Sequence, residues 1–265
     1  MRYKVDHDLH IHTCLSTCSK EPEMTAQKIL ELAEEHKLKT ICVTDHFWDE
    51  EIGDASEWYT PQGYRHISSV LPLPQGENTQ FLFGCEAELD KDFRLGLAPQ
   101  NYDKFDFIII PTTHMHSRFV LKEEDRQSVE RRAALWVERL ETVLNMNLPF
   151  HKIGLAHLAC KFIGFSTWEN YEKVMHLISD EDMERLFRKA AMLGVGIELN
   201  STDIALAQQD KELVLRPFRI AKKCGCKFYL GSDAHAPFGM TDAIPLFEQA
   251  IDWLELTEED KFRRK

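Results

Sequence analysis

Three features are scarce or missing in this sequence of 265 residues, and each absence argues against a class of protein. No apolar segment follows Met1, and no apolar run approaches the roughly 20 residues that a membrane-spanning helix needs. No cluster of Lys and Arg forms a basic stripe, and the net charge is −12. This charge argues against binding to a nucleic acid backbone, because that binding depends on many cationic contacts. We therefore expect a cytoplasmic protein without a membrane partner, and we disfavour a nucleic acid as its partner.

Cysteine is present but does not form an obvious disulfide framework. The chain has seven cysteines, an odd number, and no secretion signal accompanies them. This combination predicts reduced thiols, as in most cytosolic proteins.

Short apolar runs alternate with amphipathic stretches along most of the chain. The runs predict seven strands, at residues 4–12, 40–44, 81–83, 105–110, 152–156, 195–199 and 227–230. Helical spacing is found at residues 23–36, 63–71, 123–146, 180–193, 213–223 and 241–254. Such alternation builds a parallel α/β sheet with right-handed crossovers. A closed barrel would gather the carboxyl ends of the strands on one face, whereas a doubly wound open sheet would spread them along an edge.

Two stretches do not fit this alternation. Residues 47–64 form an irregular insertion with Trp48, Trp58 and Tyr59, which could cap a site or pack on the surface; we favour packing. The charged tail, residues 257–265, is expected to be frayed.

Polar side chains follow nearly every predicted strand. The first strand ends in Asp8-Leu9-His10-Ile11-His12, where His10 and His12 point to the same face because side chains alternate along a strand. Later strand ends carry Asp45, His46, Glu86, His114, His116, His157, Glu198, Asn200, Asp233 and His235. Seven of the twelve histidines lie at such positions. Imidazole and carboxylate ligands suit Zn, Mn or Fe, and their number exceeds the tetrahedral need of one ion, which predicts two to three divalent ions.

Four of these motifs resemble those of the PHP (polymerase and histidinol phosphatase) domain family. They are Asp8-Leu-His10-Ile-His12-Thr13, Thr44-Asp45-His46, Gly84-Cys-Glu86 and Gly231-Ser-Asp233-Ala-His235. The resemblance covers nearly the whole chain and implies one metallohydrolase domain spanning residues 1–265. It also implies the family fold, a distorted seven-stranded β/α barrel, similar to a TIM barrel, with a metal cluster at the carboxyl ends of the strands.

The resemblance further implies three metal sites. The first would use His10, His12, Glu86 and Asp233, and the second would share Glu86 with His114 and His157. His116 is an alternative to His114, although position along the strand favours His114. The third site would use His46, His235 and a residue of the loop after His12. The family commonly has His or Asp at that position and this chain has Cys18, which is either a thiolate ligand or an ordinary small loop residue.

Such a metal centre would supply a hydroxide that attacks phosphorus in line. Asp45 could orient that water or a ligand histidine. Arg118 and Lys161, four residues after His114 and His157, are candidates to clamp a phosphate, with solvated loop charges as the alternative.

The leading hypothesis is a metal-dependent phosphoesterase acting on a small phosphate monoester. Histidinol phosphate is one candidate substrate, by resemblance to PHP phosphatases of similar length. The alternatives are a phosphodiesterase acting on a nucleotide or nucleic acid and a non-catalytic metal-binding module. An amidohydrolase is disfavoured, because no Lys at a strand end is placed to form the carbamylated bridge common in that group.

Overall fold

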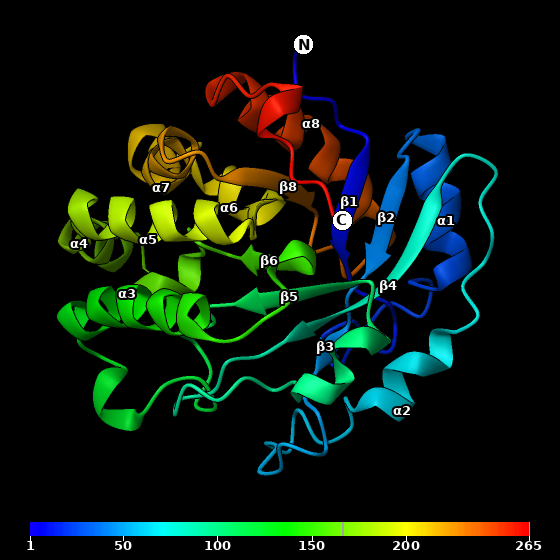
Figure 1. The fold of residues 1–265 in the computed structure, drawn as a ribbon, viewed down its shortest axis with the longest axis horizontal. Helices are drawn as coiled ribbons and strands as arrows, with labels where there is room; N and C mark the ends of the chain where they lie inside the picture. The colour runs from blue at the N-terminus through cyan, green and yellow to red at the C-terminus, as the bar shows by residue number, and fades with distance from the viewer. Residues whose placement is uncertain (166, 265) are drawn as a thin grey trace.

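A parallel sheet forms the centre of the molecule. The computed structural model describes residues 1–165 and 167–264. Its strands are β1 (His7–Ile11), β2 (Thr40–Val43), β3 (His46–Phe47), β4 (Gln80–Ala87), β5 (Phe107–Pro111), β6 (Ile153–Ala156), β7 (Gly196–Asn200) and β8 (Lys227–Gly231). They pair in the order β1-β2-β4-β5-β6-β7-β8, and the short β3 pairs with β4. Figure 1 shows these strands curving round together.

The two edges of this sheet meet at the carboxyl end of β1. The backbone N–H of Asp233 donates to the carbonyl of His10 at 2.7 Å, and that of His12 donates to the carbonyl of Ala234 at 3.0 Å. Ile11 and Ala234 form an isolated parallel bridge. The sheet is therefore a nearly closed barrel of seven parallel strands, which confirms the predicted distorted TIM-like barrel rather than the open sheet.

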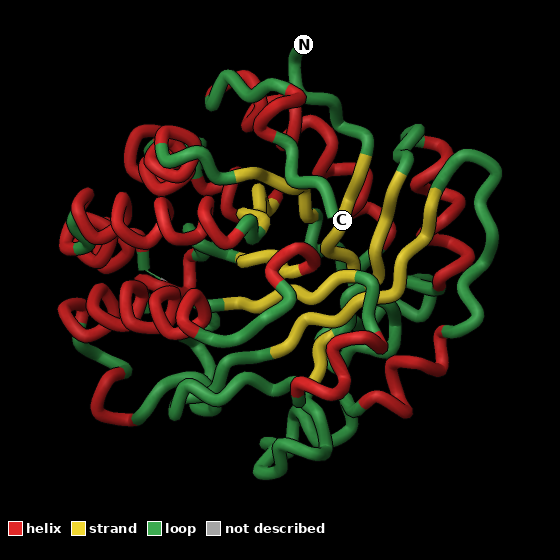
Figure 2. Tube along the Cα trace, viewed as in Figure 1, coloured by secondary structure: helices red, strands yellow, loops and turns green. Residues whose placement is uncertain are grey.

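The helices lie outside the strands (Figure 2). They are α1 (Ala26–Glu35), α2 (Tyr64–Ile67), α3 (Val129–Asn145), α4 (Trp168–Leu177), α5 (Asp180–Leu193), α6 (Ser201–Leu206), α7 (Lys211–Lys223) and α8 (Pro237–Trp253). Local signals set their ends. Thr25 caps α1 by accepting from the N–H of Lys28. Gly194 ends α5 with a φ of 74°, a left-handed conformation that suits glycine.

Several expected boundaries were wrong, for local reasons. The strand expected at 81–83 runs on through Ala87, so that Glu86 lies within it. The helix expected from residue 123 starts at Val129 because Ser128 caps it, and a 3-10 turn precedes it. The missed helix α6 begins directly at the end of β7, where the Asn200 side chain accepts from the N–H groups of Thr202 and Asp203. The sequence did not predict this helix because polar residues such as Asn200 and Ser201 are as typical of loops as of helix caps.

Residues 257–264 of the tail pack on the barrel, so the expectation of fraying was wrong for them, while residue 265 lies outside the described residues. Phe262 is buried, and its ring centroid lies 5.9 Å from that of Phe107 and 6.3 Å from that of Tyr229. The Phe262 N–H also donates to the carbonyl of Phe228 at 2.7 Å. The tail thus completes a small apolar cluster with side chains of β5 and β8, a contact between distant segments that local charge did not reveal.

Across the described ranges, no helix combines the length and the apolar character needed to cross a membrane.

Asp6 ties this tail to the start of β1. The His7 ring Nδ1 donates to Asp6 at 2.9 Å, and the Lys261 ammonium donates to both Asp6 oxygens at 2.9 and 3.0 Å. Burial by itself raises the pKa of Asp6, but the hydrogen bonds from His7 and Lys261 outweigh it and lower that pKa from 3.8 to about 2.

We therefore predict that Asp6→Asn destabilises the fold in a pH-dependent way. Because the folded-state pKa is depressed, the stabilisation by Asp6 is present above its ordinary pKa and is lost as the pH falls towards 2. Urea unfolding of both proteins across the acid range should show a difference in unfolding free energy that shrinks with falling pH. The control is Asp103→Asn, whose carboxylate is fully exposed. A difference of constant size across this range would contradict the role of the Asp6 charge.

Candidate metal centre

The two histidines at the end of β1 face each other, as the alternation predicted. Their Nε2 atoms lie 3.1 Å apart, and both side chains are fully buried. Two ring nitrogens at this separation, directed at the same space, have the arrangement of a pair of ligands to one ion.

Glu86 lies at the middle of the cluster. Strand β4 carries it, and it is 1% exposed. Its carboxylate oxygens lie 3.5 Å from His10 Nε2, 3.4 Å from His12 Nε2, 2.9 Å from His46 Nδ1, 3.6 Å from His114 Nε2 and 3.3 Å from His157 Nε2. A carboxylate with imidazoles on both oxygens is placed to bridge two ions.

Asp233 and His157 reach the cluster from strained backbone. Asp233 Oδ1 lies 3.0 Å from His12 Nε2 and 3.5 Å from His10 Nε2. Its φ is 54°, and that of His157 is 61°. Left-handed backbone at a residue other than glycine costs of order 1–3 kcal/mol and tends to occur at functional sites. His157 follows β6 directly and Asp233 lies two residues after β8, and both side chains point into the cluster.

Cys18 joins the cluster through its contact with His235. Its Sγ is 2.9 Å from His235 Nε2, and the His235 ring stacks on that of His12 with centroids 4.3 Å apart. His12, Cys18, His46 and His235 offer donor atoms that all lie within 4.8 Å of one another. The loop thus brings its cysteine to the place where the resemblance implied a ligand.

The other donor sets with the same spacing share members of the cluster. They are His10, His12 and Glu86; Glu86, His114 and His157; and His10, His157 and Glu198. Every metal ligand that the sequence predicted therefore lies in this one cluster, Asp233 through its contact with His12. Their role as ligands stays a prediction.

Most of the histidines are held by an oxygen on the ring nitrogen that faces away from the centre. The Nδ1 of His10 donates to Glu198 at 2.6 Å, that of His114 to Glu88 at 2.8 Å, and that of His235 to the Asp233 carbonyl at 2.7 Å. Such partners fix the ring and leave the other nitrogen free for a cation. Glu88 and Glu198 had no such role in the sequence prediction. The signal for Glu88 is its spacing from Glu86, since residues two apart on a strand share a face.

Asp45 is connected to this cluster indirectly, through the hydroxyl of Ser16. Its carboxylate accepts from the N–H and hydroxyl of Thr13, both at 2.7 Å, and from the Ser16 hydroxyl at 2.8 Å. Ser16 Oγ in turn lies 2.9 Å from His12 Nδ1. This geometry corresponds to orienting a ligand histidine, one of the two roles considered for Asp45.

Gly231 allows Glu198 to reach His10. A Cβ at position 231 would lie 2.1 Å from Glu198 Oε1 and 2.8 Å from the His10 Cβ. The close approach of β8 therefore needs a residue without a side chain.

The carboxylates dominate the electrostatics of the cluster. Burial tends to lower the pKa of His12, but hydrogen bonds to Asp233 and Glu86 outweigh this and raise it to about 10. The pKa of His157 is also raised to about 10, by Glu86, Glu198 and Asp233 against the opposing effect of burial. Burial would raise the pKa of Glu86, yet the surrounding histidines hold it well below its usual range. The part of the site around His12 and His157 thus favours positive charge, whereas burial lowers the pKa of His46 and His235.

Two buried atoms of the cluster test whether a cation fits. Glu86 Oε2 and His46 Nδ1 lie 2.9 Å apart, but neither atom makes a hydrogen bond of good geometry with a described residue. Leaving buried polar atoms unpaired is costly, and a metal ion shared by such donors would satisfy them. The donor set, imidazole and carboxylate with one thiol, suits a divalent transition metal.

The insertion both packs and covers the site. Trp48 and Tyr59 are buried, as favoured from the sequence, and the Tyr59 hydroxyl donates to Glu88 at 3.0 Å. Trp58 differs, because its ring lies edge-on to His46 with centroids 4.9 Å apart while 38% of the residue is exposed. Trp58 therefore forms part of the rim of the cluster.

The remaining predicted residues lie outside the cluster. His116 is exposed and its ring packs on that of Phe162, whereas His114 lies beside Glu86. The Arg118 side chain is 83% exposed, and its Nε is 4.0 Å from Glu123. Lys161 is also exposed, with its Nζ 5.4 Å from the centre of the Phe162 ring. The phosphate-clamp role of these two cations stays a prediction.

Comparison with known proteins adds one family and a set of similar folds. The PHP domain family model matches residues 8–202. A crystal structure of histidinol phosphate phosphatase from Lactococcus lactis, complexed with Zn, L-histidinol and phosphate, has a TM-score of 0.53 at 16% identity and covers 92% of this chain and 93% of that chain. A proposed histidinol phosphatase from Listeria monocytogenes has a TM-score of 0.57 at 13% identity, with coverages of 88% and 96%. No curated protein sequence matches the chain. At these identities the two structures show the fold.

We predict that Glu198→Gln weakens metal binding by about 10–100-fold, because the oxygen that orients His10 loses its charge. Competition between the protein and a chromophoric chelator measures this affinity. Glu184→Gln, on the partly exposed face of α5, is the control and should bind metal as the unmodified protein does. Equal affinities for both variants would show that Glu198 does not support the site.

We predict that Cys18→Ser lowers the metal content by one ion per chain and leaves the other ions in place. The reason is that Cys18 contacts His235 and lies apart from His114 and His157. Elemental analysis of the purified variant measures the count. Cys14→Ser changes the exposed cysteine of the same loop and is the matched control. Equal metal counts in the two variants would remove Cys18 from the ligand set.

Proposed function

This chain belongs to the PHP domain family, and from that premise we propose that it hydrolyses a small phosphate monoester at the cluster around Glu86. Metal-dependent hydrolysis of phosphoesters is the chemistry that this membership assigns to the chain. The proposal concerns the kind of ester, the number of ions and the residues that bind them.

The observation that carries the proposal is the position of Glu86 between two groups of imidazoles. His10, His12 and Asp233 would hold one ion with Glu86, and His114 and His157 would hold a second that shares Glu86. Cys18, His46 and His235 would hold a third. Zn, Mn or Fe suits these donors, and such ions, when bound, neutralise phosphoryl oxygens and make water more acidic.

The protein's own side chains would orient the ligands and shield the site. Glu88, Glu198 and the Ser16–Asp45 pair hold three of the histidine rings, which keeps the donor atoms in place before substrate arrives. Trp58 covers His46 on one side. Arg118 and Lys161 are exposed and are proposed to reach a bound phosphate from the loops that follow His114 and His157.

The acidic charge of the chain argues against a polynucleotide as the substrate, although it does not argue against a nucleotide. Histidinol phosphate is a candidate, since the similar fold from Lactococcus lactis was solved with L-histidinol and phosphate. The two proteins are similar in fold alone.

The test combines metal content with turnover. Protein reconstituted with Zn, Mn or Fe is assayed on p-nitrophenyl phosphate, bis(p-nitrophenyl) phosphate and histidinol phosphate. We expect monoester hydrolysis that a chelator abolishes. His10→Ala and Asp233→Ala should lose bound metal and more than about 100-fold in turnover, since loss of a mere orienting partner already costs 10–100-fold.

His176→Ala replaces an exposed histidine of α4 and should retain both metal and activity. Full activity in His10→Ala would refute the proposed site. Turnover of the diester alone would refute the monoester proposal and favour a phosphodiesterase.

A further inference from the structure

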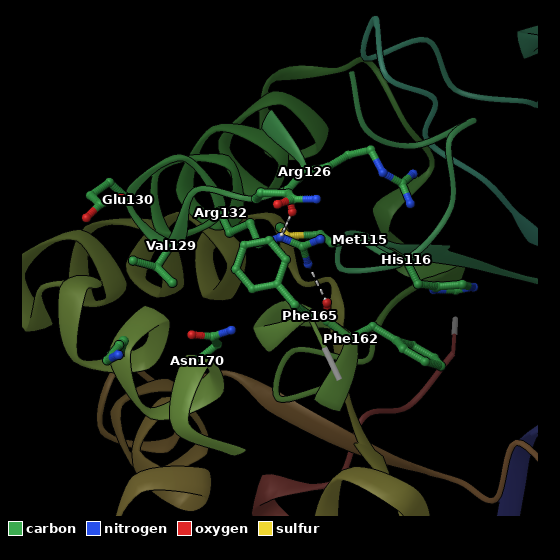
Figure 3. Close-up of a pocket in the computed structure, with 11 residues that line it drawn as sticks. Met115, His116, Arg126, Val129, Glu130, Arg132, Phe162, Phe165 and Asn170 are labelled. Atoms are coloured by element: carbon green, nitrogen blue, oxygen red, sulfur yellow. Dashed lines mark hydrogen bonds between the residues drawn. The ribbon is translucent and has the colours of Figure 1, made fainter. Parts of the chain in front are cut away.

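A pocket of about 570 Å³ lies beside the metal cluster and has no part in the function proposed so far. It is formed by the loop after β5, the start of α3, the turn at Lys161–Gly164 and α4. Figure 3 shows His116 and Phe162 at one end of this pocket and Val129 and Asn170 at the other.

The pocket begins one side chain away from a candidate metal ligand. The His116 ring centroid lies 5.7 Å from that of His114 and 4.0 Å from that of Phe162. A group attached to a phosphate at the cluster would therefore extend past His116 into this space.

The lining is cationic and includes a buried guanidinium without an acid partner. Arg132 is 3% exposed, and it donates to the carbonyls of Arg126, Phe162 and Ile163 at 2.7 to 3.1 Å. Its Cζ lies 3.8 Å from the centre of the Phe165 ring. No carboxylate pairs with Arg132 among the residues that the structure describes. Neutral carbonyls and an aromatic face fix this side chain but leave its charge uncompensated.

Arg126 adds a second incompletely paired guanidinium. Its Nη1 is buried and has no hydrogen-bond partner in the described part of the chain. The nearest carboxylate, that of Glu123, is 3.9 Å from its Nε. Lys173 also lines the pocket, although its ammonium pairs with Glu169 at 2.6 Å, and Glu130 is the one acid among the described residues that line it. Burying charges without partners is unfavourable, so this arrangement is suited to receive an anion.

We propose that this pocket binds a second anionic group, a carboxylate or a phosphate, on the part of the substrate that leaves. The proposal rests on the phosphatase function and narrows its substrate class. The substrate is then a phosphate monoester that carries another negative charge. Histidinol phosphate fits poorly, because its leaving group carries an ammonium that would face Arg126 and Arg132.

The first experiment compares matched substrates that differ in one substituent. They are phenyl phosphate, 4-carboxyphenyl phosphate, 4-phosphonophenyl phosphate and 4-(aminomethyl)phenyl phosphate, assayed with metal-loaded protein. We expect kcat/KM to be about tenfold higher for at least one anionic substrate than for phenyl phosphate, and lower for the ammonium, in line with one charge-assisted hydrogen bond. The carboxylate and phosphonate arms distinguish the two kinds of anion.

Arg126→Gln should bring the ratio of anionic to neutral kcat/KM close to one. The control is Arg131→Gln, which removes the same charge from the first turn of α3. Arg131 pairs with Asp125 and Glu138 and does not line the pocket. This variant should keep the ratio of the unmodified protein. A ratio near one in the unmodified protein, or an unchanged ratio in Arg126→Gln, would overturn the proposal.

A binding measurement separates this proposal from the phosphatase function. Calorimetry compares benzylphosphonate with 4-carboxybenzylphosphonate and 4-phosphonobenzylphosphonate on metal-loaded protein. Tighter binding of an anionic compound that is lost in Arg126→Gln supports the pocket even if no substrate is turned over, a result that would refute the hydrolase proposal alone. Equal binding of all three compounds would refute the pocket, whatever the activity.

Discussion

The buried carboxylate of Glu86 is the charge on which the arrangement of the site depends. Five imidazoles approach its two oxygens within 3.6 Å. Two of them come from the end of β1 and one each from β3 and from the ends of β5 and β6. Without that negative charge, the cluster would be a group of closely packed imidazole rings. With it, they form a site that attracts cations.

The barrel makes this meeting possible because its strands run parallel. Parallel strands bring their carboxyl ends to one face, and near closure between β1 and β8 brings Asp233 next to His12. The left-handed backbone at His157 and Asp233 shows that the fold gives up some stability to aim these side chains. Apolar contacts such as that between Phe262 of the tail and Phe107 offset the free energy that this backbone conformation costs.

The sequence was informative where chemistry and periodicity agreed. Short apolar runs with polar ends predicted a parallel sheet, and the resemblance to the PHP family predicted that this sheet closes into a barrel. The alternation in His10-Ile11-His12 predicted two rings on one face, which is how they lie. The sequence said less about partners that are distant along the chain. Nothing local shows that Glu198 holds His10 across 188 positions, that Gly231 makes room for it, or that Phe262 returns to β5 and β8. Those contacts follow from the closure of the barrel. Arg118 and Lys161 illustrate a different limit, since spacing along the chain placed them near the site but could not determine where long exposed side chains point.

The central claim, that the Glu86 cluster binds metal ions, is tested most directly by anomalous X-ray diffraction. Crystals of the protein grown with Mn or Zn are measured above and below the absorption edge of the metal. The account predicts anomalous peaks on both sides of the Glu86 carboxylate, with imidazole nitrogens about 2.1 Å from the ion in a zinc-loaded crystal. Peaks confined to exposed histidines such as His176, with none beside Glu86, would contradict it.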